Sequence, residues 1–178
     1  MPAIPVPSAS ETRCNATFEA LMWALSRPGL SRDLPQPRHR ALVEALIDRE
    51  CAVNCDDPDL ARSAAGLGAA LVAREAADHV FADRLDSAAV LRTLRQGSDL
   101  HPEDGATLVL EATLGRGQRL RMTGPGVDGA VEIAVGGLPD GFWQERTRVM
   151  RYPMGFDLFL TSGARVLGVP RSTAVEVV

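Results

Sequence analysis

The chain has 178 residues, of which 46% are hydrophobic, and this size and composition predict one domain with a sizeable core. Its 19 basic and 23 acidic residues give a net charge of −4 and are spread without blocks, which argues against a nucleic-acid clamp or a polybasic membrane anchor. Aromatic residues make up only 4%, too few for the stacking platforms of single-stranded nucleic-acid binders. We therefore expect neither nucleic acid nor a membrane as a partner.

All 19 basic residues are arginine, so the chain has no lysine. Without a lysine amine it can form no Schiff base with pyridoxal phosphate, and it cannot supply the lysine of a Walker-type phosphate loop. We therefore expect no pyridoxal phosphate, and no motif indicates another cofactor.

The distribution of cysteine and charge indicates the cytoplasm. The three cysteines, Cys14, Cys51 and Cys55, show no C-x-x-C spacing and suit a reducing compartment better than a disulfide framework. The first basic residue is Arg13, so the chain lacks the basic start of a secretory signal. Its longest uncharged inner stretch, residues 63–73, is about half of the roughly 20 residues that a membrane-spanning helix needs.

The amino-terminal half predicts alternating helices and strands. After an extended arm over residues 1–12, an apolar stripe at i, i+3, i+4 and i+7 predicts a helix over residues 13–26 that ends at Arg27-Pro28-Gly29. The further predicted elements are an extended or irregular segment at 30–37, a helix at 38–47, a short strand at 51–53, a helix from 58 to about 72, a strand at 79–82 and a helix from 87 to about 96.

Three aspartates around Pro58 allow two interpretations. Asp56, Asp57 and Asp59 could share a hard cation, but nothing nearby supplies the further oxygen ligands that calcium or magnesium needs. A helix start explains the same residues better, with Asp57 as the N-cap, Pro58 in the first helical position and Asp59 facing the helix dipole.

The carboxyl-terminal half predicts mainly strands. We expect a hairpin of strands 106–112 and 120–123 around Gly115-Arg116-Gly117, then a turn at 124–126. A strand at 131–135, a helix at 142–149 with an exposed polar face, and strands at 156–161 and 165–169 follow. Helices and strands alternate early and a meander follows late, so the predicted fold is a three-layer α/β domain with a mixed sheet over residues 13–178.

Motifs for self-sufficient catalysis are missing from the sequence. There is no Gly-x-Ser-x-Gly elbow, and the glycine pairs at 115–117 and 124–126 do not open helices, so hairpin turns explain them better than phosphate loops. The three histidines, His39, His79 and His101, are widely separated, which favours packing or surface roles over a zinc site.

Two residues are candidates for substrate binding or for an interface. Arg171 follows a predicted strand end, where ligand sites of α/β proteins tend to lie, and a guanidinium binds phosphate or carboxylate through two hydrogen bonds. Asp157 lies at the start of an apolar run, so its carboxylate needs either an ion-pair partner or a working role. Solvation or structural pairing is the default interpretation of both.

The order of several segments resembles the H subunit of bacterial carbon–phosphorus lyase. The segments are residues 18–29 (FEALMWALSRPG), 46–48 (LID), 97–98 with 107–110, 120–126 (LRMTGPG), 152–158 (YPMGFDL), 167–173 (LGVPRST) and 175–177 (VEV). The resemblance runs from about residue 11 to the end of the chain and is looser over residues 49–55.

The resemblance implies a homodimeric subunit of the cytoplasmic complex that lets bacteria use phosphonates as a phosphorus source, docked onto the other subunits of the core complex. In that pathway an alkylphosphonate and a nucleoside triphosphate are joined at the ribose carbon with loss of the base, and a separate radical iron–sulfur subunit later breaks the carbon–phosphorus bond. The implied fold is akin to pyridoxal-phosphate transferases without the cofactor, in agreement with the missing lysine.

Two hypotheses about function follow, and a third, in which the chain is a purely architectural partner, differs from the first only in whether its side chains reach the reacting centre. In the first, the chain is an accessory subunit of the phosphonate–nucleotide coupling machinery, where phosphonate and nucleoside triphosphate meet at a site shared with other subunits. In the second, it is a stand-alone enzyme or anion-binding module whose arginines, such as Arg171, bind phosphonate or phosphate directly.

Overall fold

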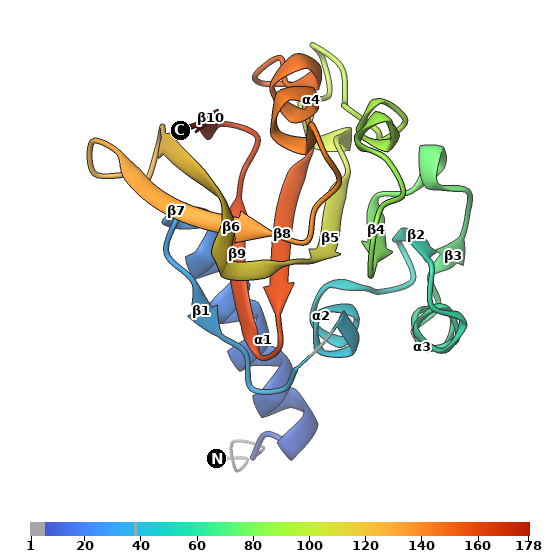
Figure 1. The fold of residues 1–178 in the computed structure, drawn as a ribbon. Helices are drawn as coiled ribbons and strands as arrows, with labels where there is room; N and C mark the ends of the chain where they lie inside the picture. The colour runs from blue at the N-terminus through green and yellow to red at the C-terminus, as the bar shows by residue number, and fades with distance from the viewer. Residues whose placement is uncertain (1–5, 38) are drawn as a thin grey trace.

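The computed structural model describes residues 6–37 and 39–178, and within them a seven-stranded mixed sheet forms the centre of the fold (Figure 1). In spatial order its strands are β1 (Arg32–Asp33), β9 (Arg165–Val169), β8 (Asp157–Ser162), β5 (Thr107–Glu111), β4 (His79–Ala82), β2 (Ala52–Cys55) and β3 (Ala70–Leu71). From β8 to β3 neighbouring strands run parallel, whereas β9 and β1 are antiparallel to their neighbours at the other edge.

The central strands are apolar on both faces because both faces are covered. In β5, for example, Leu108 and Leu110 face one hydrophobic core and Val109 faces the other. All three side chains are at most 1% exposed. The continuous apolar run of this strand is therefore the pattern expected of the middle layer in a three-layer domain.

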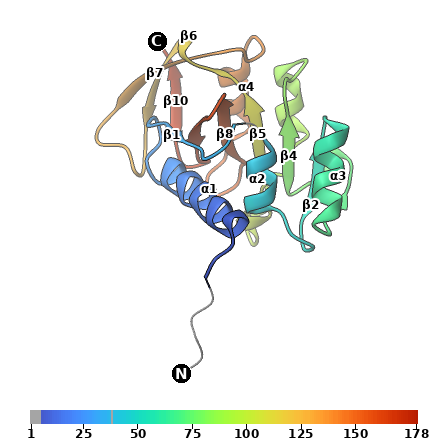
Figure 2. The ribbon, with the colours of Figure 1, turned by 90° about the horizontal axis from the view of Figure 1, so that it is seen from below.

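Three helices form the first covering layer. Helices α1 (Ala9–Ser26), α2 (His39–Leu46) and α3 (Pro58–Gly66) lie side by side along one face of the sheet (Figure 2). Leu21 and Leu42 from this layer pack with Phe159 of β8 in a single core. The apolar stripe predicted for α1 is only partly buried, because two of its members, Phe18 and Met22, are 48% and 41% exposed. The buried face of α1 consists of Leu21 and the small side chains of Thr17, Ala20 and Ala24, and the helix lies against β9.

In the described part of the chain, the other covering layer consists mainly of a second, three-stranded sheet. Its antiparallel strands, in the order β10 (Ala174–Val177), β6 (Thr113–Thr123) and β7 (Val131–Gly136), cross the main sheet beside α4 (Phe142–Val149) and the 3-10 helix η2 (Ala88–Arg92) (Figure 1). Leu120, Met122 and Trp143 pack from this layer onto the sheet. Two short 3-10 helices, η1 (Arg74–Ala76) and η3 (Pro102–Asp104), lie in the connections.

The three layers and the mixed sheet confirm the predicted fold class, and several elements match closely. The strand at 79–82, the helix at 142–149 and the strand at 165–169 have the predicted bounds. Gly29 has a positive φ of 89° at the predicted end of α1, a conformation that glycine adopts without strain.

The extended arm predicted over residues 1–12 is wrong from residue 9 onwards. Helix α1 begins at Ala9 because Ser8 and Glu11 form a capping box. The Glu11 amide donates to Ser8 Oγ at 3.2 Å, and the Ser8 amide donates to Glu11 Oε2 at 2.7 Å. The first five residues of that prediction lie outside the described part of the chain.

The hairpin predicted for residues 106–123 is also wrong. Strand β6 begins directly after β5, leaves the main sheet and pairs with β7 and β10. Gly115 and Gly117, with φ of 86° and 109°, lie inside β6 at a bulge and do not form a turn. A Cβ at position 117 would lie 2.5 Å from the Gly136 Cα, so the glycine allows β7 to approach.

Two helices are shorter than predicted. Helix α3 ends at Gly66, because the chain then forms β3 instead of continuing to residue 72. The helix predicted from residue 87 is the 3-10 helix η2, which Ser87 caps by accepting a hydrogen bond from the Ala89 amide.

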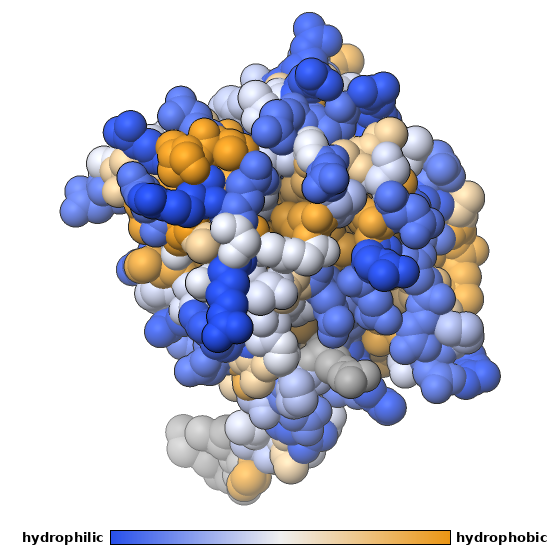
Figure 3. Space-filling view, viewed as in Figure 1, coloured by the Kyte–Doolittle hydropathy of each residue, from blue (hydrophilic) through white to orange (hydrophobic). Residues whose placement is uncertain are grey.

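Hydrophilic side chains cover most of the face seen in Figure 3, where apolar side chains gather in small separate groups. No helix in residues 6–37 and 39–178 combines the length and the apolar character needed to cross a bilayer.

Candidate functional site

Arg171 and Asp157, the two residues singled out from the sequence, lie together at the amino edge of the parallel strands. Arg171 follows β9, which runs antiparallel to β8. The end of β9 therefore lies beside the start of β8 at Asp157, and not at the carboxyl edge where ligand sites of α/β sheets gather. The topological reason for expecting a ligand at Arg171 thus does not apply.

The contacts of Arg171 close this edge of the sheet. Its Nη2 lies 2.7 Å from Asp157 Oδ2, and its backbone amide donates to Asp157 Oδ1 at 2.8 Å. Its Nη1 donates to the carbonyl oxygen of Pro102. The two side chains are only 15% and 23% exposed, so the pair supplies the partner that the buried carboxylate needs. A role for either residue in substrate binding stays a prediction.

The carboxyl edge of the sheet contains a topological switch point between β2 and β4. After β2 the chain enters α3 on the helical face, whereas after β4 it enters η2 on the opposite face. Ligands of open α/β sheets bind in the crevice at such a point. A cavity of about 170 Å³ lies there, lined by His39, Arg40, Asp57, Leu60, Asp83 and Glu111.

His39 links this cavity to the sheet. Its side chain is buried, with Nε2 3.0 Å from Oγ1 of the buried Thr161 and Nδ1 3.6 Å from Asp83 Oδ1. Three carboxylates, from Asp57, Asp83 and Glu111, give the cavity an acidic rim that can accept hydrogen bonds from hydroxyl or amine groups. His39 is buried, as the packing role expected for it requires. The position of His39 at the switch point could not be expected from the sequence, because it follows from the strand order.

The aspartates around Pro58 form the predicted helix cap. The Asp57 carboxylate accepts a hydrogen bond from the Asp59 amide at 2.8 Å, and Pro58 is the first residue of α3. Within the described ranges, no three His, Cys, Asp or Glu side chains are arranged to hold a metal ion.

Cys55, at the end of β2, is not an activated nucleophile. Burial raises the pKa of its thiol to about 11, and the charges of Asp56 and Asp57 add to the rise. The thiol is therefore protonated at neutral pH, whereas the thiolate is the reactive form.

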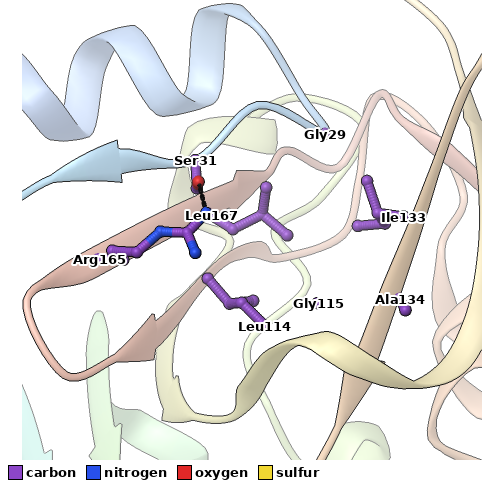
Figure 4. A pocket seen from close by; sticks show the side chains of 8 residues that line it. All are labelled: Gly29, Ser31, Leu114, Gly115, Ile133, Ala134, Arg165 and Leu167. Carbon is purple, nitrogen blue, oxygen red and sulfur yellow. Dashed lines mark hydrogen bonds between the residues drawn. The ribbon is translucent and has the colours of Figure 1, made fainter.

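A third feature, which we call the inter-sheet cleft, lies between the two sheets (Figure 4). Its volume is about 190 Å³, and it is lined by Gly29, Ser31, Leu114, Gly115, Ile133, Ala134, Arg165 and Leu167. Arg165 Nη2 donates a hydrogen bond to Ser31 Oγ at one side of the cleft, while Ile133 and Ala134 of β7 lie at the other (Figure 4). The cleft thus combines one cation and one hydroxyl with apolar walls.

Sequence reasoning missed the inter-sheet cleft. Ser31 and Arg165 are 134 positions apart, and they meet because β1 pairs with β9 at the edge of the main sheet. The one available signal was the alternation in β9, where Arg165 and Leu167 share a face and Val166 points into the helical core.

Known proteins match this chain over almost its whole length. Residues 8–176 match the family described as bacterial phosphonate metabolism protein (PhnH). A protein of Stutzerimonas stutzeri named as a C-P lyase subunit protein, HtxG, is 37% identical over 174 residues, which cover 92% of this chain and 86% of that protein.

A second relative aligns over a shorter stretch. The alpha-D-ribose 1-methylphosphonate 5-triphosphate synthase subunit PhnH of Rhizobium meliloti (strain 1021) is 39% identical over 84 residues, which cover 45% of this chain and 41% of that protein. These matches confirm the resemblance found in the order of the sequence segments. The chain belongs to the bacterial phosphonate metabolism protein (PhnH) family, the H-subunit family of carbon–phosphorus lyase.

Proposed function

We propose that this chain is an accessory subunit of the machinery that couples an alkylphosphonate to a nucleoside triphosphate, forming a ribose 1-alkylphosphonate 5-triphosphate and releasing the base. The observation that carries the proposal is the family match over residues 8–176, together with a relative that is named as a synthase subunit for such a triphosphate. The chain acts as a cytoplasmic homodimer docked onto the other subunits.

The fold is proposed to be akin to pyridoxal-phosphate transferases, and the three-layer arrangement around a mixed sheet supports this kinship. The residues of the chain do not fit that cofactor, because the sequence contains no lysine to hold it as a Schiff base. No step of the coupling is assigned to pyridoxal phosphate.

Co-expression with the other subunits tests the proposal. With an affinity tag on this chain, we expect the other subunits to co-purify under mild conditions, and light scattering of the chain alone should give the mass of a dimer. The assembled complex should release base from nucleoside triphosphate only when an alkylphosphonate is present, and complexes prepared without this chain should not.

The alternative, a stand-alone enzyme, predicts a different result. Turnover of nucleoside triphosphate and phosphonate by the purified chain alone, at a rate that survives repeated purification, would contradict the accessory role. Failure to associate with the other subunits would contradict it as well.

A further inference from the structure

We propose that the inter-sheet cleft binds an alkylphosphonate, with the phosphonate group on Arg165 and Ser31 and the alkyl group between the apolar walls. The naming of this ligand rests on the proposed function. The chemistry of the cleft by itself selects a small organic oxyanion with a short apolar tail.

The polar side of the cleft suits an oxyanion. Arg165 carries five N–H donors, of which the Nη2 donor engages Ser31 Oγ. Within the described chain, no carboxylate lies at ion-pair distance from this guanidinium, in contrast to the paired guanidinium of Arg171. A planar guanidinium binds a phosphonate through two parallel hydrogen bonds, and the Ser31 hydroxyl, whose oxygen already accepts from Arg165, has its own proton to donate.

The apolar side suits a short alkyl group. Leu114 of β6, Ile133 of β7 and Leu167 of β9 bring side chains from both sheets to one cavity (Figure 4). Leu167 is only 2% exposed, so an alkyl group placed against it leaves water.

The size of the cleft decides between the two substrates of the coupling reaction. Its volume of about 190 Å³ is below the roughly 300–1,000 Å³ typical of pockets for larger ligands. A nucleoside triphosphate is too large to enter, whereas a phosphonate with a few carbon atoms is not. Gly115 adds no side chain to the lining of the cleft, and a Cβ at this position would meet no atom within 4 Å.

One neighbouring charge opposes an anion. Asp33 lies directly opposite Arg165 in the pairing of β1 with β9, and this places both side chains on the same face of the sheet. Its carboxylate repels a bound phosphonate at the rim of the cleft, so removing that charge should strengthen binding.

The test uses the purified full-length chain and a series of probes: inorganic phosphate, methylphosphonate, ethylphosphonate and propylphosphonate. Titration followed by NMR should show an affinity that rises about fourfold for each added methylene group. Saturation transfer should be strongest at the terminal methyl protons, because that end is enclosed by the cleft.

Four variants locate the binding. Arg165→Gln should weaken propylphosphonate binding at least tenfold, and Asp33→Asn should strengthen it severalfold. Ile133→Phe fills the apolar side and should abolish the dependence on alkyl length. Arg119→Gln is the matched control, because Arg119 is also a strand arginine but its exposed side chain pairs with Glu132 at 2.7 Å, and it should bind like the unmodified chain.

Several results would overturn the proposal. These are no saturable binding by the isolated chain, equal affinity for phosphate and propylphosphonate, or equal weakening by Arg165→Gln and Arg119→Gln. Thermal unfolding of each variant shows whether it is folded. If Arg165→Gln does not fold, the stronger binding expected of Asp33→Asn still tests the proposal.

The assembled complex separates this proposal from the proposed function. If the Arg165→Gln complex assembles and couples with an unchanged KM for the alkylphosphonate, the cleft assignment fails while the accessory role stands. If no complex with this chain couples phosphonate to nucleotide, the proposed function fails, and binding by the isolated chain is judged from the titrations alone.

Discussion

Gly168 of β9 lies so close to Ala24 of α1 that a Cβ at position 168 would be 2.6 Å from the Ala24 carbonyl carbon. Backbone therefore meets backbone where the first helix crosses the sheet. This close approach holds the end of α1, and with it the turn at Gly29, against the strand that carries Arg165.

Gly168→Ala should destabilise the protein by about 1–3 kcal/mol, because the added methyl group forces α1 away from β9. Gly66→Ala is the matched control. A Cβ at this helical position meets nothing within 4 Å, so the substitution should stabilise by about 0.5–1 kcal/mol through helix propensity. Urea unfolding of the two variants measures both effects, and equal effects would contradict the close packing.

Arg171→Ala should destabilise by about 2–4 kcal/mol, because it leaves the largely buried Asp157 carboxylate without its guanidinium partner. It also removes the donor to the Pro102 carbonyl. The comparison is Arg119→Ala, which breaks an ion pair whose side chains are 69% and 55% exposed and should cost at most about 0.5 kcal/mol. Denaturant unfolding decides, and a loss at Arg171 no larger than at Arg119 would show that the pair is dispensable for folding.

Much of the fold follows from sequence periodicity, for example the strand at 79–82 and the helix predicted at 38–47, which is α2. These elements were predictable because their own residues carry the pattern, whether as an apolar run or as a helical repeat. The bulged strand β6 was not, because Gly115 and Gly117 give the same local signal in a turn as in a bulge. The close approach of β7 decides between them, and this is a tertiary contact.

The candidate sites were less predictable than the fold. Arg171 and Asp157 could be recognised as unusual, but their pairing depends on the antiparallel direction of β9. The helix at 142–149 is predicted to expose its polar face, yet two of its polar residues, Glu145 and Arg146, are only 6% and 2% exposed. The reason is that Arg92 of η2 pairs with Glu145, while Arg146 donates to the carbonyl oxygens of Pro170 and Thr173.

Stability should depend on pH through Glu145. Its hydrogen bonds with Arg92, of 2.6 Å and 3.0 Å, lower the pKa of its carboxyl group below the ordinary value of 4.5. Because the pKa is lower in the folded state, the stabilisation is present above about pH 4.5 and is lost as the pH falls through the lowered value.

The Glu145→Gln variant tests this dependence. Its unfolding free energy should be below that of the unmodified chain at pH 6, and the difference should shrink steadily below pH 4.5. Glu132→Gln, at an exposed ion pair, should change stability by less than about 0.5 kcal/mol at pH 6. A difference for Glu145→Gln that does not change between pH 6 and pH 3 would contradict the role of the ionised carboxylate.

Cys55 should react slowly with alkylating reagents in the folded protein. With a pKa of about 11, raised mainly by burial, only about 0.1% of its thiol is ionised at pH 8. In a variant with Cys14 and Cys51 replaced by serine, iodoacetamide should therefore modify Cys55 about a hundredfold more slowly in the folded chain than in urea.

The rate in the folded chain should rise about tenfold for each pH unit up to about pH 10, because the thiolate fraction does so. This pH profile separates a raised pKa from restricted access, since restricted access alone lowers the rate by a constant factor and leaves the midpoint near that of an ordinary thiol.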